Sequence, residues 1–453
     1  MKRIGTAVLT QLVLVSVALA ILLTSVSAQD VAAKLDAYAT AAAQQKLFTG
    51  SVLIAQKGTV LLSKGYGMAN IELDVANTPQ TKFRLGSITK QFTAASILLL
   101  QEQGKLSVQD PVCKFVTECP PAWQALTIHH LLSHTGGVPN FTSFPDYTKT
   151  MMMPSPAEVT LGRFKDKPLT FTPGEKWNYS NSGYVLLGVI IEKVSGLNYG
   201  EFVRTRIFEP LKMSNSGYDR FDLITKNRAS GYANDRGIWV NAPYLDMTIP
   251  HAAGSLYSTV EDLYLWDQSL YTERLLNAKS LAHMFTMVLN DYGYGWGVGT
   301  QFQRKHISHG GGINGFATFI SRYPEEKVTV IVLSNFQQAN AGKIARDLGA
   351  AVFGEPYEIP RARVVAKVDP KIYDAYLGKY ELAPPATMTV TRNGEKLFAQ
   401  LTGQPVFEIF PESETKFFLR VVEAQLTFVR NEEGKVTQLI LHQGGDRIFR
   451  KIE

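Results

Sequence analysis

The sequence is poor in cysteine and in charge, and several kinds of segment are missing from it. Its 453 residues include only two cysteines, and charged side chains make up 19% of the chain. No internal repeat, low-complexity tract or cluster of basic side chains is present, so nothing points to a nucleic-acid partner. The composition is that of a soluble globular protein, and the length is sufficient for two domains.

The N-terminal 28 residues differ from the rest of the chain. Lys2 and Arg3 precede an uncharged apolar run that starts at Ile4, and the small residues of the segment 26–28 precede Gln29. This order predicts a secretory signal peptide, residues 1–28, that is cleaved on export to the periplasm or the extracellular space. The apolar run is also long enough for an uncleaved membrane anchor, which is the alternative.

The two cysteines, Cys113 and Cys119, lie together in a proline-bounded segment, 110–120. In an exported protein we expect two such neighbours to form a disulfide. No histidine adjoins them, so a metal site there is not favoured. His130 and His134 have the spacing of metal ligands on a helix, but acidic residues are scarce around them, and we predict packed or turn-bonding histidines. No metal and no cofactor are therefore expected.

The order of predicted elements indicates an α+β fold. We expect a helix at 30–46, two strands within 50–66, short helices from 106 to about 292, strands at 293–302, 305–311, 316–322 and 327–334, and a helix at 341–352. Strands from both ends of this region enclose a helical middle. That order predicts one antiparallel sheet flanked by helices, with a helical subdomain.

The remainder of the chain predicts a second, smaller domain. A proline-bearing linker, 355–369, follows the α+β domain of residues 29–354. Residues 370–453 alternate between apolar and polar side chains in short runs, which are separated by turn sequences rich in glycine. This pattern predicts a small β-barrel or meander.

Ser87 is the first candidate for chemistry. It lies at the expected start of an apolar helix, and Lys90 follows one turn later on the same face. A lysine that is buried beside a serine can become neutral enough to take the hydroxyl proton. The same S-x-x-K pattern recurs at Ser413 and Lys416, in a charged turn of the tail without helix or burial, so the pattern alone does not discriminate.

Tyr179 and Asn181 form the second candidate, in a loop just before an apolar helix. A phenol near a buried ammonium has a lowered pKa, so Tyr179 could exchange protons with Ser87. The Asn181 amide could bridge Lys90 and a substrate carbonyl. A similar tripeptide, 232–234, lacks the following helix, and we reject it.

The third candidate is the run His309-Gly310-Gly311-Gly312, which leads from a strand into a hairpin. Glycines there leave a strand edge bare, so that a substrate backbone could lie against it. The N–H groups of Ser87 and Gly312 could then form an oxyanion hole. A similar tripeptide, 134–136, follows a helix and not a strand.

Taken in order, the three candidates resemble the active site of the penicillin-recognising serine hydrolases. The resemblance is greatest to the branch that holds class C β-lactamases, D-alanyl-D-alanine carboxypeptidases, D-aminopeptidases and related esterases. That family shows S-x-x-K, then Y-x-N, then K-T-G or H-x-G. The resemblance covers residues 30–354 and includes the stretches 131–137 and 252–259. The tail resembles the lipocalin-like domain of some members.

The resemblance implies a role for each residue. Ser87 matches the nucleophile, Lys90 its partner, Tyr179 the general base and Asn181 the orienting amide, with Gly312 at the oxyanion hole. The implied reaction is hydrolysis through an acyl-enzyme of a small peptide or ester.

One departure from the family bears on the substrate. Family β-lactamases carry lysine at the position of His309, and histidine is only partly charged near neutral pH. We therefore expect peptides with D-amino acids, or related amides and esters, with carboxylesterase or weak β-lactamase activity as the alternative. A non-catalytic protein that binds cell-wall peptides is the alternative of another class. The C-terminal domain could mediate homo-oligomer formation.

Overall fold

The computed structural model describes residues 29–235, 237–361, 363–384, 386–419, 424–443 and 445–452. Contacts divide the chain into a larger unit, Met1–Ala233 with Asn241–Ile359, and a smaller unit, Asn234–Val240 with Pro360–Glu453. The predicted signal peptide lies outside the described residues, so cleavage or retention stays a prediction. Within the described ranges, no helix has the length and apolar character that crossing a bilayer requires.

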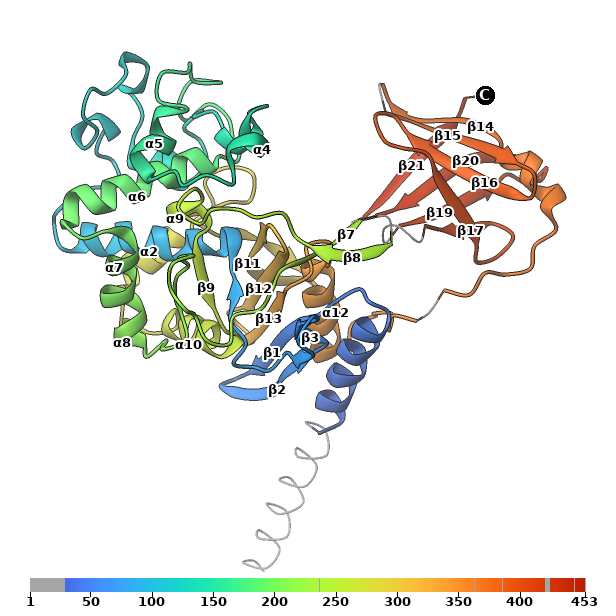
Figure 1. The fold of residues 1–453 in the computed structure, drawn as a ribbon, viewed down its shortest axis with the longest axis horizontal. Coiled ribbons are helices and arrows are strands. Elements are labelled where there is room, and N and C mark those ends of the chain that lie inside the picture. The colour runs from blue at the N-terminus through green and yellow to red at the C-terminus, as the bar shows by residue number, and fades with distance from the viewer. Residues whose placement is uncertain are drawn as a thin grey trace, which may run out of the picture. The chain divides into compact units, whose positions relative to one another are not determined.

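The larger unit is built on one six-stranded antiparallel sheet (Figure 1). Its strands, in spatial order, are β10 (Gly297–Gln301), β11 (Arg304–Ile313), β12 (Phe316–Tyr323), β13 (Val328–Ser334), β1 (Gly50–Gln56) and β2 (Thr59–Tyr66). The pairing of β1 with β13, with Leu53 opposite Ile331, joins the N-terminal hairpin to the four later strands. The predicted α+β architecture with an antiparallel sheet is therefore confirmed.

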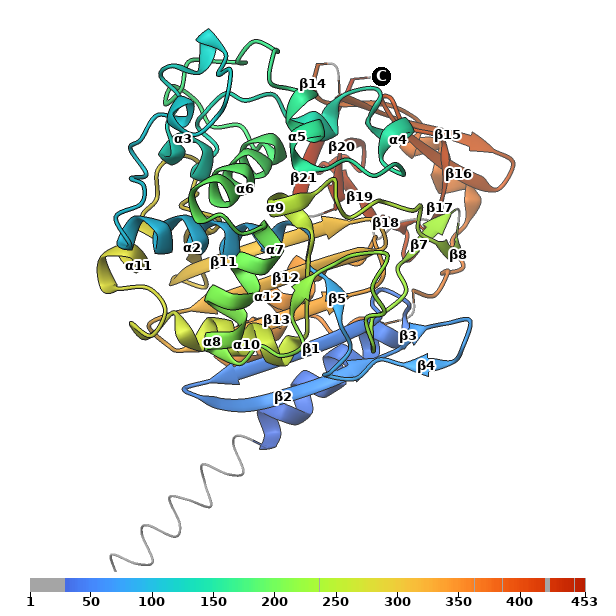
Figure 2. The ribbon, with the colours of Figure 1, turned by 60° about the vertical axis from the view of Figure 1, so that its left-hand side comes forward.

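Helices cover both faces of this sheet, because its central strands are apolar on both sides. Every residue of β13 is buried. Helix α10 (Val260–Ser269) packs on β1 and β13, whereas α12 (Ala341–Phe353) packs on β12 and β13. The helix at 29–44 joins α12, since the Tyr38 hydroxyl donates a hydrogen bond to Asp347 at 2.7 Å. Figure 2 shows α10 and α2 on the side of the sheet away from that N-terminal helix.

The remaining helices of the larger unit are short, with two exceptions. These elements are η1 (Gly86–Ile88), α2 (Thr89–Glu102), η2 (Val112–Lys114), η3 (Pro121–Trp123), α3 (Ile128–Leu132), η4 (Phe141–Ser143), α4 (Tyr147–Thr150), α5 (Ala157–Gly162), α6 (Asn181–Ser195), α7 (Tyr199–Val203), η5 (Arg204–Phe208), α8 (Glu209–Leu211), α9 (His251–Gly254) and α11 (Ala278–Met284). The two long ones, α2 and α6, pack against each other, and α2 is buried along almost its whole length. They carry two of the three sequence candidates.

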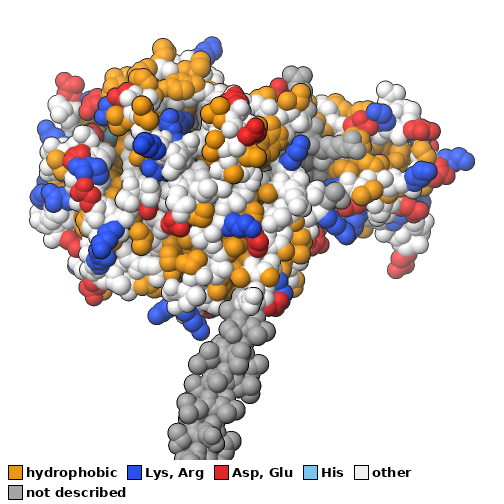
Figure 3. Space-filling model, turned by 60° about the horizontal axis from the view of Figure 1, so that its bottom comes forward, with side chains coloured by type: hydrophobic (Ala, Val, Ile, Leu, Met, Phe, Trp, Pro, Cys, Tyr) orange, Lys and Arg blue, Asp and Glu red, His pale blue; other side chains and the backbone are white. Residues whose placement is uncertain are grey.

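Short strands and one disulfide tie down the loops. The small sheets are formed by β3 (Met68–Asn70) with β4 (Val75–Ala76), by β5 (Phe83–Arg84) with β9 (Leu256–Ser258) and β6 (Gly217–Tyr218), and by β7 (Tyr232–Asp235) with β8 (Ile238–Asn241). Cys113 and Cys119 are joined in a disulfide. On the face that Figure 3 shows, Lys and Arg side chains are interspersed with Asp and Glu.

The smaller unit contains a closed eight-stranded barrel. Its strands are β14 (Gly378–Ala383), β15 (Ala386–Asn393), β16 (Lys396–Leu401), β17 (Phe407–Pro411), β18 (Lys416–Phe418), β19 (Gln425–Arg430), β20 (Val436–His442) and β21 (Asp446–Lys451), preceded by η6 (Pro370–Tyr376). Aromatic side chains fill its core, with Tyr376 stacked on Phe428 at 4.2 Å between ring centroids. Of the barrel and the meander left open by the sequence, the barrel is correct. Residues 355–361 and 363–369 form neither helix nor strand.

Candidate active site

Ser87 lies in the tight turn that leads from strand β5 into helix α2. Gly86 has φ +54, a left-handed conformation that favours glycine, and Leu85 is held by a backbone hydrogen bond from its N–H to the Leu256 carbonyl (2.8 Å). Gly86 and Ile88 are buried, but Ser87 is partly exposed. Helix α2 begins at Thr89, so Ser87 precedes the helix by one short 3₁₀ turn instead of lying inside it.

Lys90 is fully buried and makes three polar contacts. Its Nζ lies 3.1 Å from Ser87 Oγ, 2.8 Å from Asn181 Oδ1 and 2.8 Å from the Ala253 carbonyl oxygen. The amide and carbonyl oxygens only accept hydrogen bonds, so they take two N–H groups of Lys90. The third position on the tetrahedral nitrogen faces Ser87. An amine places its lone pair there, where it can accept the hydroxyl proton.

Burial favours this amine form. Removal from water penalises the ammonium and holds the pKa of Lys90 well below its ordinary value. The aromatic rings of Tyr179 and Tyr184 lie 4.8 Å and 5.4 Å from Nζ at their centroids, so the site can still accommodate the ammonium that forms when a proton arrives. Lys90 therefore has the surroundings of a base that gains and loses one proton.

Tyr179 stands beside the same hydroxyl, but its electrostatics differ from the prediction. Burial raises the pKa of Tyr179 above its ordinary value, and the hydrogen bond with Ser87 offsets this only in part. The predicted lowering of this pKa by a neighbouring ammonium is therefore wrong, because removal from water penalises the charged phenolate of Tyr179. Burial therefore favours the protonated phenol at Tyr179 and shifts Lys90 towards the neutral amine.

Asn181 is the first residue of helix α6, and its side chain is fixed on both sides. Its Oδ1 accepts from Lys90, while its Nδ2 donates to Thr142 Oγ1 at 3.2 Å. Its backbone N–H donates to Asn140 Oδ1 at 3.1 Å. The helix start is set by Ser180, whose hydroxyl caps it by accepting from the Gly183 N–H. These contacts orient the amide toward Lys90.

His309, on strand β11, is uncharged, which sharpens the sequence expectation of a partial charge. Its Nδ1 lies 2.6 Å from the Gly310 carbonyl, which only accepts, so Nδ1 carries the hydrogen. Its Nε2 then accepts from the Tyr292 hydroxyl at 2.9 Å. Burial, helped by the charge of Lys90, lowers the pKa of His309 to about 4. This position therefore offers no fixed positive charge near neutral pH.

The glycines of β11 differ in what surrounds them. A Cβ at Gly311 would lie 2.0 Å from the Leu85 carbonyl oxygen, so only glycine lets the strand approach the turn that holds Ser87. A Cβ at Gly86 would lie 3.0 Å from the Gly312 nitrogen, which places the two candidate oxyanion donors on adjoining backbone. A Cβ at Gly312 would meet nothing within 4 Å. A Cβ at Gly310 would lie 3.2 Å from the ring of Phe319 and 3.8 Å from the Thr318 carbonyl oxygen.

His134 belongs to this site, although its sequence context predicted only a packed or turn-bonding histidine. Its ring centroid lies 4.3 Å from that of Tyr179, and its Nδ1 accepts from the Ser180 N–H at 3.2 Å. It thereby holds the loop that presents Tyr179. The side chain is 2% exposed and its backbone has φ +58. The sequence signal was the stretch 131–137, but the ring contact with Tyr179 is long-range and has no local signature.

The described part of the chain does not bring potential metal ligands together. Within those residues, no group of three or more His, Cys, Asp or Glu side chains is arranged to hold a metal ion. His130 instead completes the start of helix α3, where its Nδ1 accepts from the Thr127 N–H at 3.2 Å.

Two segments of the chain match known families. Residues 30–353 match the family described as Beta-lactamase, and residues 362–451 match a domain of unknown function, DUF3471. The protein "Penicillin-binding protein 4*" of Bacillus subtilis strain 168 is 32% identical over 429 residues, which are 88% of this chain and 94% of that protein.

Two solved structures are also similar. The octameric penicillin-binding protein homologue from Pyrococcus abyssi superposes with a TM-score of 0.67 at 28% identity, over 92% of this chain and 99% of that one. The penicillin-binding protein from Bacillus halodurans gives a TM-score of 0.63 at 30% identity, over 70% of this chain and 98% of that one. The similarity thus includes both the fold and the sequence.

Proposed function

The chain belongs to the Beta-lactamase family of serine hydrolases, and from this premise we propose an exported hydrolase that works through an acyl-enzyme. Its proposed substrates are peptides containing D-amino acids, or related amides and esters. The observation that carries the proposal is the buried Lys90, whose nitrogen joins Ser87 Oγ, Asn181 Oδ1 and the Ala253 carbonyl. Burying a lysine without a carboxylate at its nitrogen costs folding free energy, and a catalytic role explains why the chain carries one here.

The proposed first half-reaction forms an ester between Ser87 and the substrate acyl group. Lys90 accepts the hydroxyl proton as Ser87 Oγ bonds to the carbonyl carbon. The N–H groups of Ser87 and Gly312 stabilise the oxyanion. The bond to the leaving amine or alcohol then breaks, and Tyr179 hands that group a proton and is reprotonated from Lys90.

The second half-reaction uses the same groups in the reverse direction. Water loses a proton to Tyr179 and Lys90 as its oxygen bonds to the acyl carbon. The carbon–Oγ bond breaks, the acid leaves, and Ser87 regains its proton. Because the resting Tyr179 is protonated, we assign the base to the Tyr179 and Lys90 pair instead of to Tyr179 alone.

The uncharged His309 supports substrates without a free carboxylate at that end of the site. A cationic side chain in this place would hold a carboxylate. Both ring nitrogens of His309 instead form hydrogen bonds, with the Gly310 carbonyl and the Tyr292 hydroxyl. We therefore favour amides and esters over β-lactams. Export and assembly into an oligomer are also proposed. They rest on the sequence of residues 1–28 and on similarity to the octameric homologue.

Parallel assays test this function. Purified protein is given a p-nitrophenyl ester, a chromogenic cephalosporin, and one peptide amide in its D and L forms, each beside Ser87→Ala. We expect hydrolysis of the ester and of the D form, weak or no cephalosporin turnover, and no activity in the variant. A preference for the L form would contradict the substrate class. Silence in all assays would favour the cell-wall peptide binder.

A further inference from the structure

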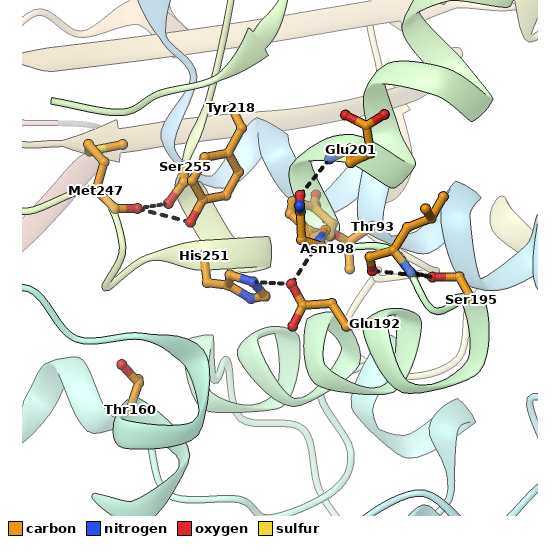
Figure 4. A network of polar contacts seen from close by, with 12 residues as sticks. Thr93, Thr160, Glu192, Ser195, Asn198, Glu201, Tyr218, Met247, His251 and Ser255 are labelled. Carbon is orange, nitrogen blue, oxygen red and sulfur yellow. Dashed lines mark hydrogen bonds and ion pairs between the residues drawn. The ribbon is translucent and has the colours of Figure 1, made fainter. Parts of the chain in front are cut away.

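A second polar network lies behind the site, where helices α2, α6, α7 and α9 meet (Figure 4). Its centre is Glu192 of α6, whose Oε1 lies 3.3 Å from His251 Nε2 and accepts from the Tyr199 N–H at 2.7 Å. The pKa of Glu192 lies below its ordinary value: burial raises it, but the contacts with His251 and the Tyr199 N–H outweigh burial. An ionised carboxylate only accepts, so His251 Nε2 carries a hydrogen and donates it.

The network continues to the backbone that holds Lys90. The Tyr199 hydroxyl lies 2.8 Å from Thr93 Oγ1, and Thr93 donates to the Ala252 carbonyl at 2.6 Å. The next carbonyl, that of Ala253, accepts from Lys90. His251 and Thr93 therefore fix α9 from two sides, and α9 is a single turn of four residues, His251–Gly254.

His251 needs such support because of its own backbone. Its φ is +42, a conformation that side-chain-bearing residues adopt at a cost. The ring is packed closely: a Cβ at Gly188 of α6 would lie 2.5 Å from it, and the ring centroid of Tyr199 lies 5.2 Å away. The surroundings of the imidazole therefore hold the start of α9 in a conformation that the chain alone would not keep.

We propose that His251 and Glu192 are positioning residues, which act through α9 to keep the Ala253 carbonyl on the nitrogen of Lys90. This inference rests on the proposed function, since it assigns the network to the base of that reaction. The Ala253 oxygen occupies one of the two N–H groups of the Lys90 amine, so it decides where the lone pair points. Without it, the amine can rotate away from Ser87.

The carbonyl also affects the proton affinity of Lys90. Its negative end faces the nitrogen and favours the ammonium, so its displacement lowers the pKa of Lys90 further. Tyr179, Tyr184, His134 and His309 are the other titratable groups that face this nitrogen, and none of them lies in the network. A change in the network therefore has a readout separate from folding: the pH at which Ser87 becomes reactive.

The experiment measures the rate at which a fluorophosphonate labels Ser87 between about pH 4 and 10, because phosphonylation does not depend on the natural substrate. His251→Leu and Glu192→Ala remove the contact. Glu192→Gln keeps an acceptor for Tyr199 and for His251. Thr93→Val removes the other support of α9 with little change in shape, and it serves where a larger change prevents folding. Glu201→Gln, at an exposed pair with Arg204 in the same region, is the matched control.

We expect the plateau rate to fall about tenfold in His251→Leu, Glu192→Ala and Thr93→Val, and the acidic limb to move to lower pH. The plateau rate of Glu192→Gln should stay within about threefold of the wild-type rate, and the plateau rate of Glu201→Gln should equal the wild-type rate. Folded variants that keep the wild-type limb and plateau, even with a lower Tm, would overturn the inference alone. Failure of the wild type to react would overturn the proposed function and this inference together.

Discussion

The chain contains the pattern S-x-x-K twice, and the two copies have opposite surroundings. Ser87 and Lys90 lie at the start of a buried helix, where the lysine nitrogen faces the serine hydroxyl at 3.1 Å. Ser413 lies in the turn after strand β17 of the barrel and Lys416 begins strand β18, and Ser413 Oγ accepts from the Lys416 backbone N–H, also at 3.1 Å. The Lys416 side chain is exposed.

The difference shows that reactivity comes from the environment and not from the tetrapeptide. In the barrel, the serine oxygen satisfies a backbone donor and the ammonium stays in water. In the larger unit, burial strips the ammonium of water, and two fixed acceptors leave one position on the nitrogen for Ser87. Substitutions made in both copies can therefore separate chemistry from side-chain loss.

The largest expected difference is between Lys90→Met and Lys416→Met. Loss of Lys90 removes the proton acceptor, and we expect kcat/KM for a p-nitrophenyl ester to fall on the order of 10⁴-fold. The exposed Lys416 should change kcat/KM less than twofold and the free energy of unfolding by no more than about 0.5 kcal/mol. Steady-state kinetics and chemical denaturation measure both. Equal losses in the two variants would remove the distinction between the copies.

The next effect concerns Tyr179, which has no counterpart at the barrel copy. Tyr179→Phe keeps the ring that contacts His134 but removes the hydroxyl, and we expect a loss of roughly 10²–10³-fold in kcat/KM with little change in stability. Tyr376→Phe, at a buried tyrosine of the barrel, is the control for loss of a hydroxyl. A Tyr179→Phe variant with wild-type kcat/KM would exclude proton transfer through this residue.

A smaller effect tests strand β11, which packs against the turn that holds Ser87. A methyl group at Gly311 would meet the Leu85 carbonyl, and we expect Gly311→Ala to cost about 1–3 kcal/mol of unfolding free energy and about tenfold in activity. The neighbouring Gly312→Ala places its methyl in open space and should cost less than about 0.5 kcal/mol. The reverse order of stabilities would contradict the described register.

The smallest expected effect is on the pH dependence of KM, because burial lowers the pKa of His309 as it lowers that of Lys90. With a pKa of about 4, His309 carries no charge near neutrality. KM for a succinyl ester, which bears a carboxylate, should then change less than about twofold between about pH 5.5 and 7.5. A histidine with an ordinary pKa would lose charge in this range, and KM would rise. Such a rise, absent for the neutral acetyl ester, would contradict the assignment.

Much of this arrangement follows from local pattern. The alternation of apolar residues around 50–66 and 316–334 indicated strands of the sheet, and the apolar run after Lys90 indicated a buried helix. The exact start of helix α10 does not follow from local pattern, since Ser258 and Thr259 both precede it and the structure shows that Thr259 caps it by accepting from the Asp262 N–H. Both residues can cap, and only the backbone at the boundary decides between them.

Long-range contacts account for what the sequence did not reveal. The Ala253 carbonyl comes to Lys90 across a separation of 163 residues, and a backbone acceptor has no signature in the side-chain sequence. The ring contact of His134 with Tyr179 and the burial that sets the Tyr179 pKa likewise arise only when distant segments of the chain meet. The pKa shifts of Lys90 and Tyr179 both follow from burial, which disfavours the charged form of each group.

The most direct test of the central claim is to locate the reactive serine. A fluorophosphonate is reacted with the folded wild-type protein, with Ser87→Ala and with Ser413→Ala, and the modified peptide is identified by mass spectrometry. We predict one adduct, on Ser87, at equal rates in wild type and Ser413→Ala, and none in Ser87→Ala. An adduct on Ser413, or equal labelling of Ser87→Ala and wild type, would contradict the account.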